Sequence, residues 1–379
     1  MTDAANGVMA LVEAVDRRDL ARFEPVWRDL AARAGEPNAF AEPDFLIPAL
    51  QRLASPRVRL LLVWRDAGRQ ALIGIAAIAP PRLSFGLASL WRSEQAALPA
   101  ILLDRDAAID ALAAILDALR LRAPGLVGLR LPYSTVGGPV AAAAAALAAR
   151  RGLGLQSAHP RRRAALVIGA NPNFEARLDK RRRKEWARQR RRLEEIGPVE
   201  SRVGADTAAI EGFLAVENSG WKGARRSALG AHVERAAFAR EMLARFAARG
   251  ALEVHTLALK GEPIAVATLL RAGARAFYWK TAYDERFAAF SPGVQATLDM
   301  SRRLERDPDL TLVDSCALAN HPMIDRAWRD RLELIDLAVS LAPGGGAAFA
   351  LAAAVAHGIE RLKRRARRFV GAATRRTGP

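Results

Sequence analysis

The same order of predicted elements occurs twice along the chain, and this repeat constrains the fold more than any other sequence feature. In the first half, apolar runs at 58–64 and 72–79 flank a turn at 66–68 and predict a β-hairpin. Apolar residues at helical spacing follow over 109–119, and the run 126–131 predicts another strand. The predicted order of this half is therefore β-β-(β)-α-β.

The second half repeats this order. The runs 252–259, 263–270 and 275–282 are separated by short glycine-containing turns and predict a three-stranded meander. A helix is predicted over 291–306, and the run 311–314 predicts a further strand. Two tandem copies of one unit predict an α/β fold with a mixed sheet.

The length of 379 residues fits this division, because a single hydrophobic core rarely organises so long a chain. We predict an N-terminal domain at 1–160 and a C-terminal domain at 161–340, which carries a basic helix at 174–196. A basic helical tail occupies 341–379. Near the N-terminus, apolar residues recur at helical spacing over 11–27 and predict a first helix.

The composition is that of a globular protein, with 51% hydrophobic and 26% charged residues. The one cysteine, Cys316, cannot form an internal disulfide, and we expect it to be a small buried residue in a reducing compartment. The N-terminus has no basic segment followed by an apolar stretch, and no apolar window reaches the length of a membrane span. We expect a cytoplasmic protein.

The net charge of +18 is concentrated in two segments. Residues 177–192 hold ten Lys or Arg and two acids, and residues 361–379 hold eight Lys or Arg and no acid. Because the rest of the chain is nearly neutral, this distribution predicts local contacts with anions and argues against nucleic acid as a partner. A solvated helix face and a flexible tail explain the two segments equally well.

The C-terminal tail carries apolar residues at helical spacing from Phe349 to Phe369, interspersed with arginines and preceded by glycines at 344–346. This pattern is typical of a basic amphipathic helix at a membrane surface. The sequence therefore suggests a flexible glycine hinge, followed by peripheral contact of residues 347–379 with the anionic inner face of a membrane.

Several segments between residues 165 and 335 stand in an order and spacing typical of one protein family. They are the basic helix that starts near Lys180, the segments Asn218-Ser219-Gly220-Trp221-Lys222-Gly223 and Gly261-Glu262-Pro263-Ile264-Ala265, the run from Tyr283-Asp284 to Ser291-Pro292-Gly293, and Asp314 with the following His321-Pro322. In these segments the chain resembles the CelD/BcsL-like acetyltransferases of the cellulose-biosynthesis type. That family is related to the Fem-type aminoacyltransferases and belongs to the GNAT superfamily. The resemblance implies two GNAT-like domains and acetyl-CoA or another acyl-CoA as the donor.

The corner formed by Ser291, Pro292 and Gly293 is the predicted donor site. Ser291 can cap a helix, Pro292 fits its first position, and Gly293 lets a ligand approach the amides of a positive helix end. With Gln295 in the next turn, these residues are predicted to bind the CoA pyrophosphate. An ordinary helix start explains the same residues, and the corner lacks the Gly-x-Gly/Ala pattern of typical GNAT loops.

Acyl transfer needs a proton acceptor and donors that stabilise an oxyanion. Asp314 ends the strand after the predicted helix, where ligands collect in open α/β sheets, and it is the predicted base or substrate anchor. Tyr283 is the predicted acid or oxyanion donor. An aspartate that caps a turn and an aromatic ring packed on the sheet explain these two residues equally well.

Five further residues are predicted to contact the acceptor. Tyr278 and Lys280 share one face of the third strand of the meander, Trp221 and Lys222 lie in a glycine-flanked loop, and His321 is a second candidate base. Core packing of Trp221, a solvated Lys222 and a structural loop histidine are the alternatives. The histidines are dispersed and no metal-binding spacing occurs, so no metal is predicted.

Two functions are compatible with these observations. The first is an acyl-CoA-dependent N- or O-acetyltransferase that acts on a sugar, an amino-sugar, or a polysaccharide or envelope precursor. The second is a noncatalytic GNAT-like module that binds an anionic polymer or a membrane surface. Binding of an acyl donor distinguishes the two.

Overall fold

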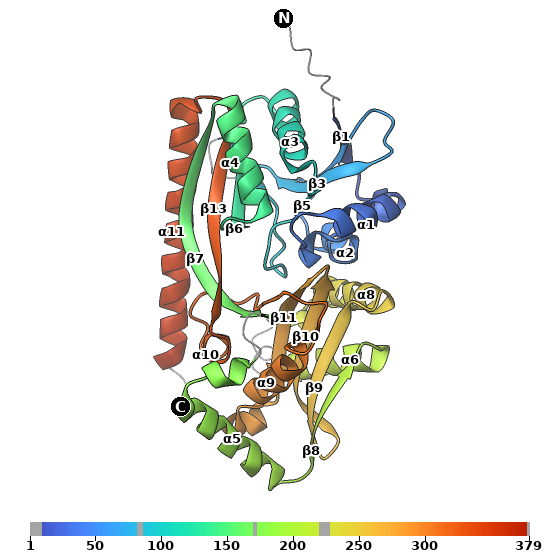
Figure 1. Cartoon of the computed structure of the whole chain (residues 1–379), viewed down its shortest axis with the longest axis vertical. Coiled ribbons are helices and arrows are strands. Elements are labelled where there is room, and N and C mark those ends of the chain that lie inside the picture. Colours follow the sequence, from blue (N-terminus) through green and yellow to red (C-terminus); the bar gives the residue numbers. More distant parts are fainter. Residues whose placement is uncertain (1–9, 82–85, 170–172, 220–227, 377–379) are drawn as a thin grey trace, which may run out of the picture.

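The computed structural model describes residues 10–81, 86–169, 173–219 and 228–376, with side chains described up to residue 362. Within these residues the strands form one 13-stranded sheet in the order β1-β2-β3-β4-β6-β13-β7-β12-β11-β10-β9-β8, with β5 paired to β3. Figure 1 shows two stacked halves that are joined by the long strands β7 and β13. The predicted mixed α/β fold is confirmed.

The N-terminal half is built around the predicted hairpin, now β2 and β3. Leu61 and Val63 pack toward α3 and α4, whereas Leu60 and Leu62 pack toward α1 and α2. Both faces are therefore covered, which explains why the hairpin reads as continuous apolar runs. The elements are β1 (Leu11–Val15), α1 (Glu24–Arg33), η2 (Ala39–Ala41), α2 (Pro43–Arg52), β2 (Arg59–Trp64), β3 (Leu72–Ala79), β4 (Leu87–Leu90), β5 (Ile101–Leu103), α3 (Ala108–Arg122), β6 (Gly128–Thr135) and α4 (Pro139–Arg151).

The C-terminal half contains the predicted meander and the predicted helix after it. Its elements are η3 (Phe174–Arg177), α5 (Lys180–Glu194), β8 (Val199–Gly204), α6 (Thr207–Ser219), α8 (Val233–Ala248), β9 (Leu252–Leu259), β10 (Glu262–Ala272), β11 (Arg275–Tyr283), η5 (Glu285–Phe290), α9 (Pro292–Leu304), β12 (Leu312–Asp314) and α10 (Ile324–Ala327). The strand β13 (Asp330–Pro343) and the helix α11 (Gly346–Arg376) complete the chain.

The two halves repeat one topology. In the first, β4 runs parallel to β6 and the connection between them contains α3. In the second, β11 runs parallel to β12 and the connection contains α9. In each case only three residue pairs are in register before the parallel strands part, so each half has an opening between two diverging strands.

The long strands β7 (Leu153–Val167) and β13 are exchanged between the halves. β13 follows the C-terminal half in sequence but pairs with β6 of the N-terminal half, whereas β7 follows the N-terminal half but pairs with β12. The two long strands also pair with each other along most of their length. The domain boundary predicted between residues 160 and 161 falls inside β7, which belongs to both halves.

A shared core also connects the halves. Phe40 and Phe45, from the N-terminal half, make edge-to-face contacts with Phe277 and Phe238 of the C-terminal half, with ring centroids 5.4 and 5.3 Å apart. Such aromatic pairs stabilise beyond the area that they bury. Arg275 adds an ion pair to Glu36 at 3.1 Å.

Two predictions of elements need correction. Residues 11–15 form the edge strand β1, and α1 begins only at Glu24, so a helix over 11–27 is wrong. A spacing of four residues places side chains on the same side of a strand as well as of a helix, and pairing with β2 decides the conformation.

The C-terminal segment is also not a free tail. Phe349, Ala352, Ala353 and Ala356 of α11 are buried against the sheet, and Figure 1 shows α11 running alongside β7. In the part of the chain that the structure describes, no helix combines the length and apolar character that crossing a membrane requires.

Candidate active site

The opening between β11 and β12 lies at the predicted site. The two strands are paired as far as Phe277 and Asp314, and β11 then continues to Tyr283 while the chain after β12 turns away. The helix α9 begins at Pro292, shortly after the end of β11. The structure therefore brings Tyr283 to the start of α9, whereas Asp314 is paired at the level of Phe277, near the other end of β11.

The start of α9 differs in one respect from the predicted cap. Ser291 has a left-handed backbone (φ 51°, ψ 51°), and its side chain accepts no capping hydrogen bond. Its carbonyl instead accepts hydrogen bonds from the amides of Val294 and Gln295, at 2.9 and 3.1 Å. Since Pro292 has no N–H, the Gly293 amide is the first-turn donor without a backbone acceptor among the described residues.

Two side chains lie against this helix start. A Cβ atom at Gly293 would stand 3.4 Å from the ring of Tyr283 and 3.7 Å from the sulfur of Met323. The backbone is thus approached closely from the side of β11. Gln295 does not face this region freely, because its amide nitrogen donates to the Trp186 carbonyl at 2.9 Å and the residue is buried.

The basic helix α5 packs beside the start of α9. Besides the bond from Gln295 to Trp186, the side chain of Gln189 donates to the carbonyl of Ala289 at 3.3 Å. The guanidinium of Arg192 lies 5.7 Å from the centroid of the Phe290 ring. Two features that are a hundred residues apart in sequence, a cationic helix and a positive helix end, are therefore neighbours.

The equivalent helix start in the N-terminal half has the opposite character. Asp104 and Asp106 precede α3 and Asp110 lies in its first turn, whereas the first turn of α9 contains no acid. Carboxylates at a helix N-terminus occupy the position that an anionic ligand would take. Of these two equivalent helix starts, only that of α9 has no carboxylate in its first turn.

Asp314 is buried and both its oxygens are engaged. Oδ2 forms an ion pair with Arg163 of β7, and Oδ1 accepts the backbone amide of Cys316 at 2.9 Å. Its role as the base stays a prediction, although this geometry favours a structural one. Cys316 is half-buried rather than buried. Enclosure of its thiol, and then the neighbouring Asp314 carboxylate, raise the pKa of Cys316 well above its usual value, which disfavours a nucleophile.

The tyrosines of β11 are in contrasting environments. Tyr278 is buried and its hydroxyl shares a 2.9 Å hydrogen bond with Thr297, and burial raises the pKa of Tyr278. Tyr283 is 36% exposed, with its ring next to the start of α9. Lys280 places its ammonium 5.3 Å from the Trp279 ring centroid. Of the two tyrosines, Tyr283 is therefore the one that a ligand can reach.

The remaining predicted contacts are partly outside the described residues. Trp221 and Lys222 fall in the segment 220–227, which the structure does not describe. His321 is half-buried in the loop before α10, and its Nδ1 accepts the Met323 amide at 3.4 Å. His321 stands two residues before Met323 in sequence, and the Met323 sulfur would lie 3.7 Å from a Cβ at Gly293.

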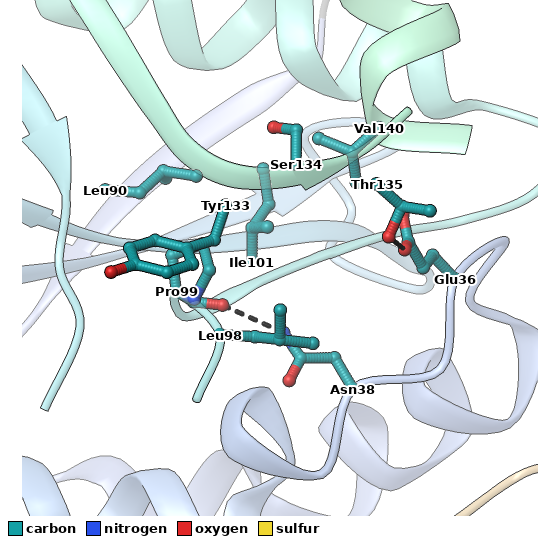
Figure 2. A pocket seen from close by; sticks show the side chains of 10 residues that line it. All are labelled: Glu36, Asn38, Leu90, Leu98, Pro99, Ile101, Tyr133, Ser134, Thr135 and Val140. Atoms are coloured by element: carbon teal, nitrogen blue, oxygen red, sulfur yellow. Dashed lines mark hydrogen bonds between the residues drawn. The ribbon is translucent and has the colours of Figure 1, made fainter. Parts of the chain in front are cut away.

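A small cavity lies at the equivalent opening of the N-terminal half, where β4 and β6 part (Figure 2). Its volume is about 20 Å³, roughly the space for one water molecule. Figure 2 shows two hydrogen bonds across it: Asn38 donates to the Pro99 carbonyl at 2.8 Å, and Thr135 donates to Glu36 at 2.5 Å. The N-terminal opening is thus closed by side chains. Sequence reasoning did not identify these residues, which no motif marks.

A second cavity of about 180 Å³ lies between β8, β9 and α9. Its lining includes His255, whose Nε2 is 2.9 Å from Glu253, and Asp299, which is paired with Arg190 at 3.0 Å. Neither cavity is lined by Ser291, Gly293 or Asp314.

Comparisons with known proteins define the class. Residues 180–345 match the sequence model of a family described as an acetyltransferase (GNAT) domain. A search of curated protein sequences gives no match.

Solved structures share the whole fold. A crystal structure of FemX is 13% identical, covers 86% of this chain and 96% of that chain, and superposes with a TM-score of 0.54. The C-terminal domain of a putative lysylphosphatidylglycerol synthetase from Agrobacterium fabrum is 12% identical, with coverage of 89% and 95% and a TM-score of 0.54. At such identities the likeness concerns the fold alone. Residues 180–345, in the C-terminal half, are thus similar to a GNAT acetyltransferase domain, and the class of protein is an acyltransferase.

Proposed function

We propose that the C-terminal half binds acetyl-CoA or another acyl-CoA and transfers its acyl group to an amine or hydroxyl. The single observation that carries this proposal is the contrast between the two helix starts. The start of α9 has no acid in its first turn and lies beside the cationic helix α5, whereas α3 is preceded by Asp104 and Asp106. A pyrophosphate is stabilised by the first of these environments and repelled by the second.

The residues at this corner fit such a donor. The Gly293 amide is free to donate a hydrogen bond to a phosphate oxygen. The first turn of α9, which follows Ser291, contains no carboxylate. Arg192 lies within reach of the same region through its contact with Phe290. Gln295 is omitted from the donor site, because it holds α5 against α9.

The thioester of acyl-CoA supplies an activated carbonyl, which an amine or hydroxyl attacks to give a tetrahedral oxyanion. Tyr283 is positioned at the end of β11 to donate its phenolic proton, either to that oxyanion or to the departing thiolate. The proton released by the attacking group needs an acceptor. His321, near Met323, is the described residue that suits this task better than the fully engaged Asp314.

For the acceptor we propose a sugar, an amino-sugar, or a polysaccharide or envelope precursor. The support is the resemblance of residues 165–335 to the CelD/BcsL-like acetyltransferases. The acceptor is identified by offering acetyl-CoA with amino-sugars, neutral oligosaccharides, amino acids and phosphatidylglycerol, and by detecting the acylated product by mass spectrometry. Product formed only from amino acids or the lipid would replace the sugar proposal.

Calorimetric titration tests the donor site. Acetyl-CoA, a longer acyl-CoA and free CoA are titrated into the wild type and into Gly293→Trp, whose side chain must displace Tyr283 and Met323. We expect a Kd in the micromolar range, roughly −8 kcal/mol, that is lost in the variant. Gly212→Trp is the matched control, because nothing lies within 4 Å of a Cβ at Gly212. No binding to the wild type by any donor, or equal binding by Gly293→Trp, would contradict the proposal.

A further inference from the structure

The cavity between β8, β9 and α9 is called the edge cavity, because β8 is the last strand of the sheet. It lies outside the proposed acyl-transfer site, since none of Ser291, Gly293 and Asp314 lines it. Its volume of about 180 Å³ is far more than one water molecule needs, and a protein cavity of roughly 150 Å³ holds a benzene molecule. The edge cavity therefore has room for a small organic ligand.

Part of the lining is apolar and buried. Leu257 of β9 and Ala296 of α9 belong to one hydrophobic cluster and are 0% and 3% exposed. Val203 of β8, which pairs with His255 of β9, also lines the cavity but is 44% exposed. The cavity thus combines a buried apolar surface with an entrance at the edge of the sheet.

His255 contributes an unused hydrogen-bonding atom to the edge cavity. The residue is 5% exposed, and its Nε2 lies 2.9 Å from Oε2 of Glu253. Because a carboxylate only accepts hydrogen bonds, Nε2 carries the hydrogen, and Nδ1 of the neutral imidazole is then an acceptor. Nδ1 has no hydrogen-bond partner among the described residues and is not a fully enclosed atom. This buried ring therefore offers an acceptor to an occupant of the cavity.

Arg303 of α9 supplies donors beside this acceptor. Its Nε lies 3.4 Å from Oε2 of Glu253, the same oxygen that His255 contacts, so the two side chains are neighbours. The terminal nitrogens Nη1 and Nη2 of Arg303 have no partner among the described residues, and the side chain is 60% exposed. A guanidinium with free terminal nitrogens binds a carboxylate or a phosphate through two parallel hydrogen bonds.

The other charged side chains of the lining are already engaged. Asp299 accepts hydrogen bonds from Ser201 and from Arg190, the latter at 3.0 Å. Arg202 is paired with Glu200 at 2.5 Å. Asp299 is therefore satisfied without Arg303, whose terminal nitrogens are left for a ligand.

We propose that the edge cavity binds a small oxyanion that also carries a hydroxyl group, either a hydroxycarboxylate or a hydroxylated phosphate ester. The oxyanion pairs with the terminal nitrogens of Arg303, and the hydroxyl donates to Nδ1 of His255. The carbon skeleton covers Leu257 and Ala296. An apolar surface with a few polar groups that fix orientation is the usual composition of a small-molecule site. The inference does not depend on the identity of the acyl donor.

Titration of the isotope-labelled full-length protein, followed by the NMR signals of its imidazoles, tests the site. The chain has five histidines, so the signal of His255 is assigned by its loss in His255→Gln. Lactate carries a hydroxyl and a carboxylate, propionate lacks the hydroxyl, and lactamide lacks the charge. Glycerol 3-phosphate shows whether a phosphate serves as the oxyanion. We expect lactate or glycerol 3-phosphate to shift the His255 signal in the millimolar range, and propionate and lactamide to bind about tenfold more weakly.

Three variants separate the site from general attraction to arginines. Arg303→Gln should weaken binding of the oxyanion at least about tenfold. Arg306→Gln, which is exposed and outside the lining, removes the same charge and should bind like the wild type. Val203→Trp fills the cavity from its exposed edge and should abolish binding, while all three variants keep the wild-type melting temperature.

Four outcomes overturn the proposal. They are the absence of a His255 shift with lactate and with glycerol 3-phosphate, binding of propionate or lactamide as tight as that of the hydroxylated oxyanion, unchanged binding by folded Arg303→Gln or Val203→Trp, and equal loss in Arg306→Gln.

Discussion

Tyr278 and Tyr283 stand on the same strand but differ in what their hydroxyls can do. The hydroxyl of Tyr278 is hydrogen-bonded to the hydroxyl of Thr297, which itself donates to the Gly293 carbonyl at 2.7 Å. Tyr283 is partly exposed beside the same glycine. The first tyrosine supports the helix start, and the second faces the ligand.

Replacement of each tyrosine by phenylalanine separates these roles. Tyr283→Phe should lower kcat by about 100-fold if the phenol donates a proton in the transition state, with little change in unfolding free energy. Tyr278→Phe is the matched control, and should cost about 1 kcal/mol of stability while leaving kcat within a few-fold. Release of the CoA thiol measures acyl transfer, and urea titration measures the unfolding free energy. A Tyr283→Phe enzyme with wild-type kcat would exclude this tyrosine from the chemistry.

Asp314 has a counterpart that clarifies its role. The counterpart in the N-terminal half is Arg130. Asp314 is the third residue of β12 that pairs with β11, opposite Phe277, and Arg130 is the third residue of β6 that pairs with β4, opposite Ser89. Asp314 is paired with Arg163 of β7, and Arg130 lies 3.8 Å from Asp336 of β13. The repeat thus retains an ion pair beside each opening with the charges exchanged, which is the pattern of a structural device.

A double-mutant cycle decides between structure and catalysis at Asp314. Asp314→Asn and Arg163→Met should each cost about 3 kcal/mol, because each leaves a buried partner uncompensated, and the double variant should cost much less than their sum. Urea unfolding measures these energies, and activity is expressed per folded molecule. If Asp314→Asn abolishes activity while the unfolding free energy is unchanged, Asp314 is the base after all.

The sequence located the site region better than the roles within it. Ser291, Pro292 and Gly293 do form a helix start, and Pro292 takes the first helical position, which its fixed φ favours. The engagement of Gln295 by Trp186 and of Asp314 by Arg163 was not predictable. Both partners lie more than 100 residues away, and no local pattern records such long-range pairing.

At the level of elements, Phe349 holds α11 on the sheet, because its ring packs over Gly128 and Gly154, which together are called the glycine seat. A Cβ atom at Gly128 would lie 2.8 Å from the Phe349 ring, and one at Gly154 would lie 3.1 Å from it. These glycines on β6 and β7 therefore create the space that an aromatic ring needs to reach the sheet. The seat explains how α11 is held close to both long strands.

Substitutions at Gly128 and Gly358 test the seat. Gly128→Ala should destabilise the protein by about 1–3 kcal/mol, because the new methyl overlaps the Phe349 ring and Leu87. Gly358→Ala, within α11, has nothing within 4 Å and should stabilise the helix by about 0.5–1 kcal/mol. Thermal unfolding measured by circular dichroism compares the two. Equal effects at both positions would show that the ring does not fill this space.

Elements with strong local signals were predictable, and exchanged strands were not. The hairpin β2–β3 and the meander β9–β10–β11 read directly from apolar runs that end at turn residues. β7 is largely polar between Gln156 and Arg163, so no apolar run marks it. β13 does alternate Leu332 and Leu334 with polar residues, a period-two signal that could have identified the strand but not its partner.

At the scale of the whole molecule, an ionic network ties the two halves together. Glu42 and Asp44 at the start of α2 are paired with Arg249 at the end of α8. Burial, reinforced by the nearby Asp44 charge, raises the pKa of Glu42 to about 7, although Arg249 opposes the shift. The interface therefore contains a carboxyl group that is protonated more readily in the folded state.

This shift predicts the sign of a pH dependence. Between pH 4.5 and 7 the unfolded chain releases the Glu42 proton while the folded protein retains it, so the unfolding free energy should fall as pH rises through this window. Glu42→Gln should lack this component, and the difference between the two proteins should become constant above about pH 8. Urea titrations in steps of one pH unit measure it, with the exposed Glu200→Gln as control. Parallel curves for wild type and Glu42→Gln would contradict the shift.

The exchange of β7 and β13 predicts that the halves unfold as one unit. Each half lacks a sheet strand without the other, and Phe40 and Phe277 share one core across the interface. Leu112→Ala, in the buried face of α3, should cost about 2–5 kcal/mol and should lower the protection of β10 as much as that of β3.

Hydrogen exchange followed by mass spectrometry in sub-denaturing urea reports each half separately. Met300→Ala, in the core of the C-terminal half, serves as the reciprocal variant and should weaken β3 to the same extent as β10. A chain that ends at residue 327 should leave the N-terminal half without protection as well, since β6 then loses its partner β13. Independent loss of protection in the mutated half alone would show that the exchanged strands connect two autonomous domains, which is the organisation that the sequence repeat by itself predicts.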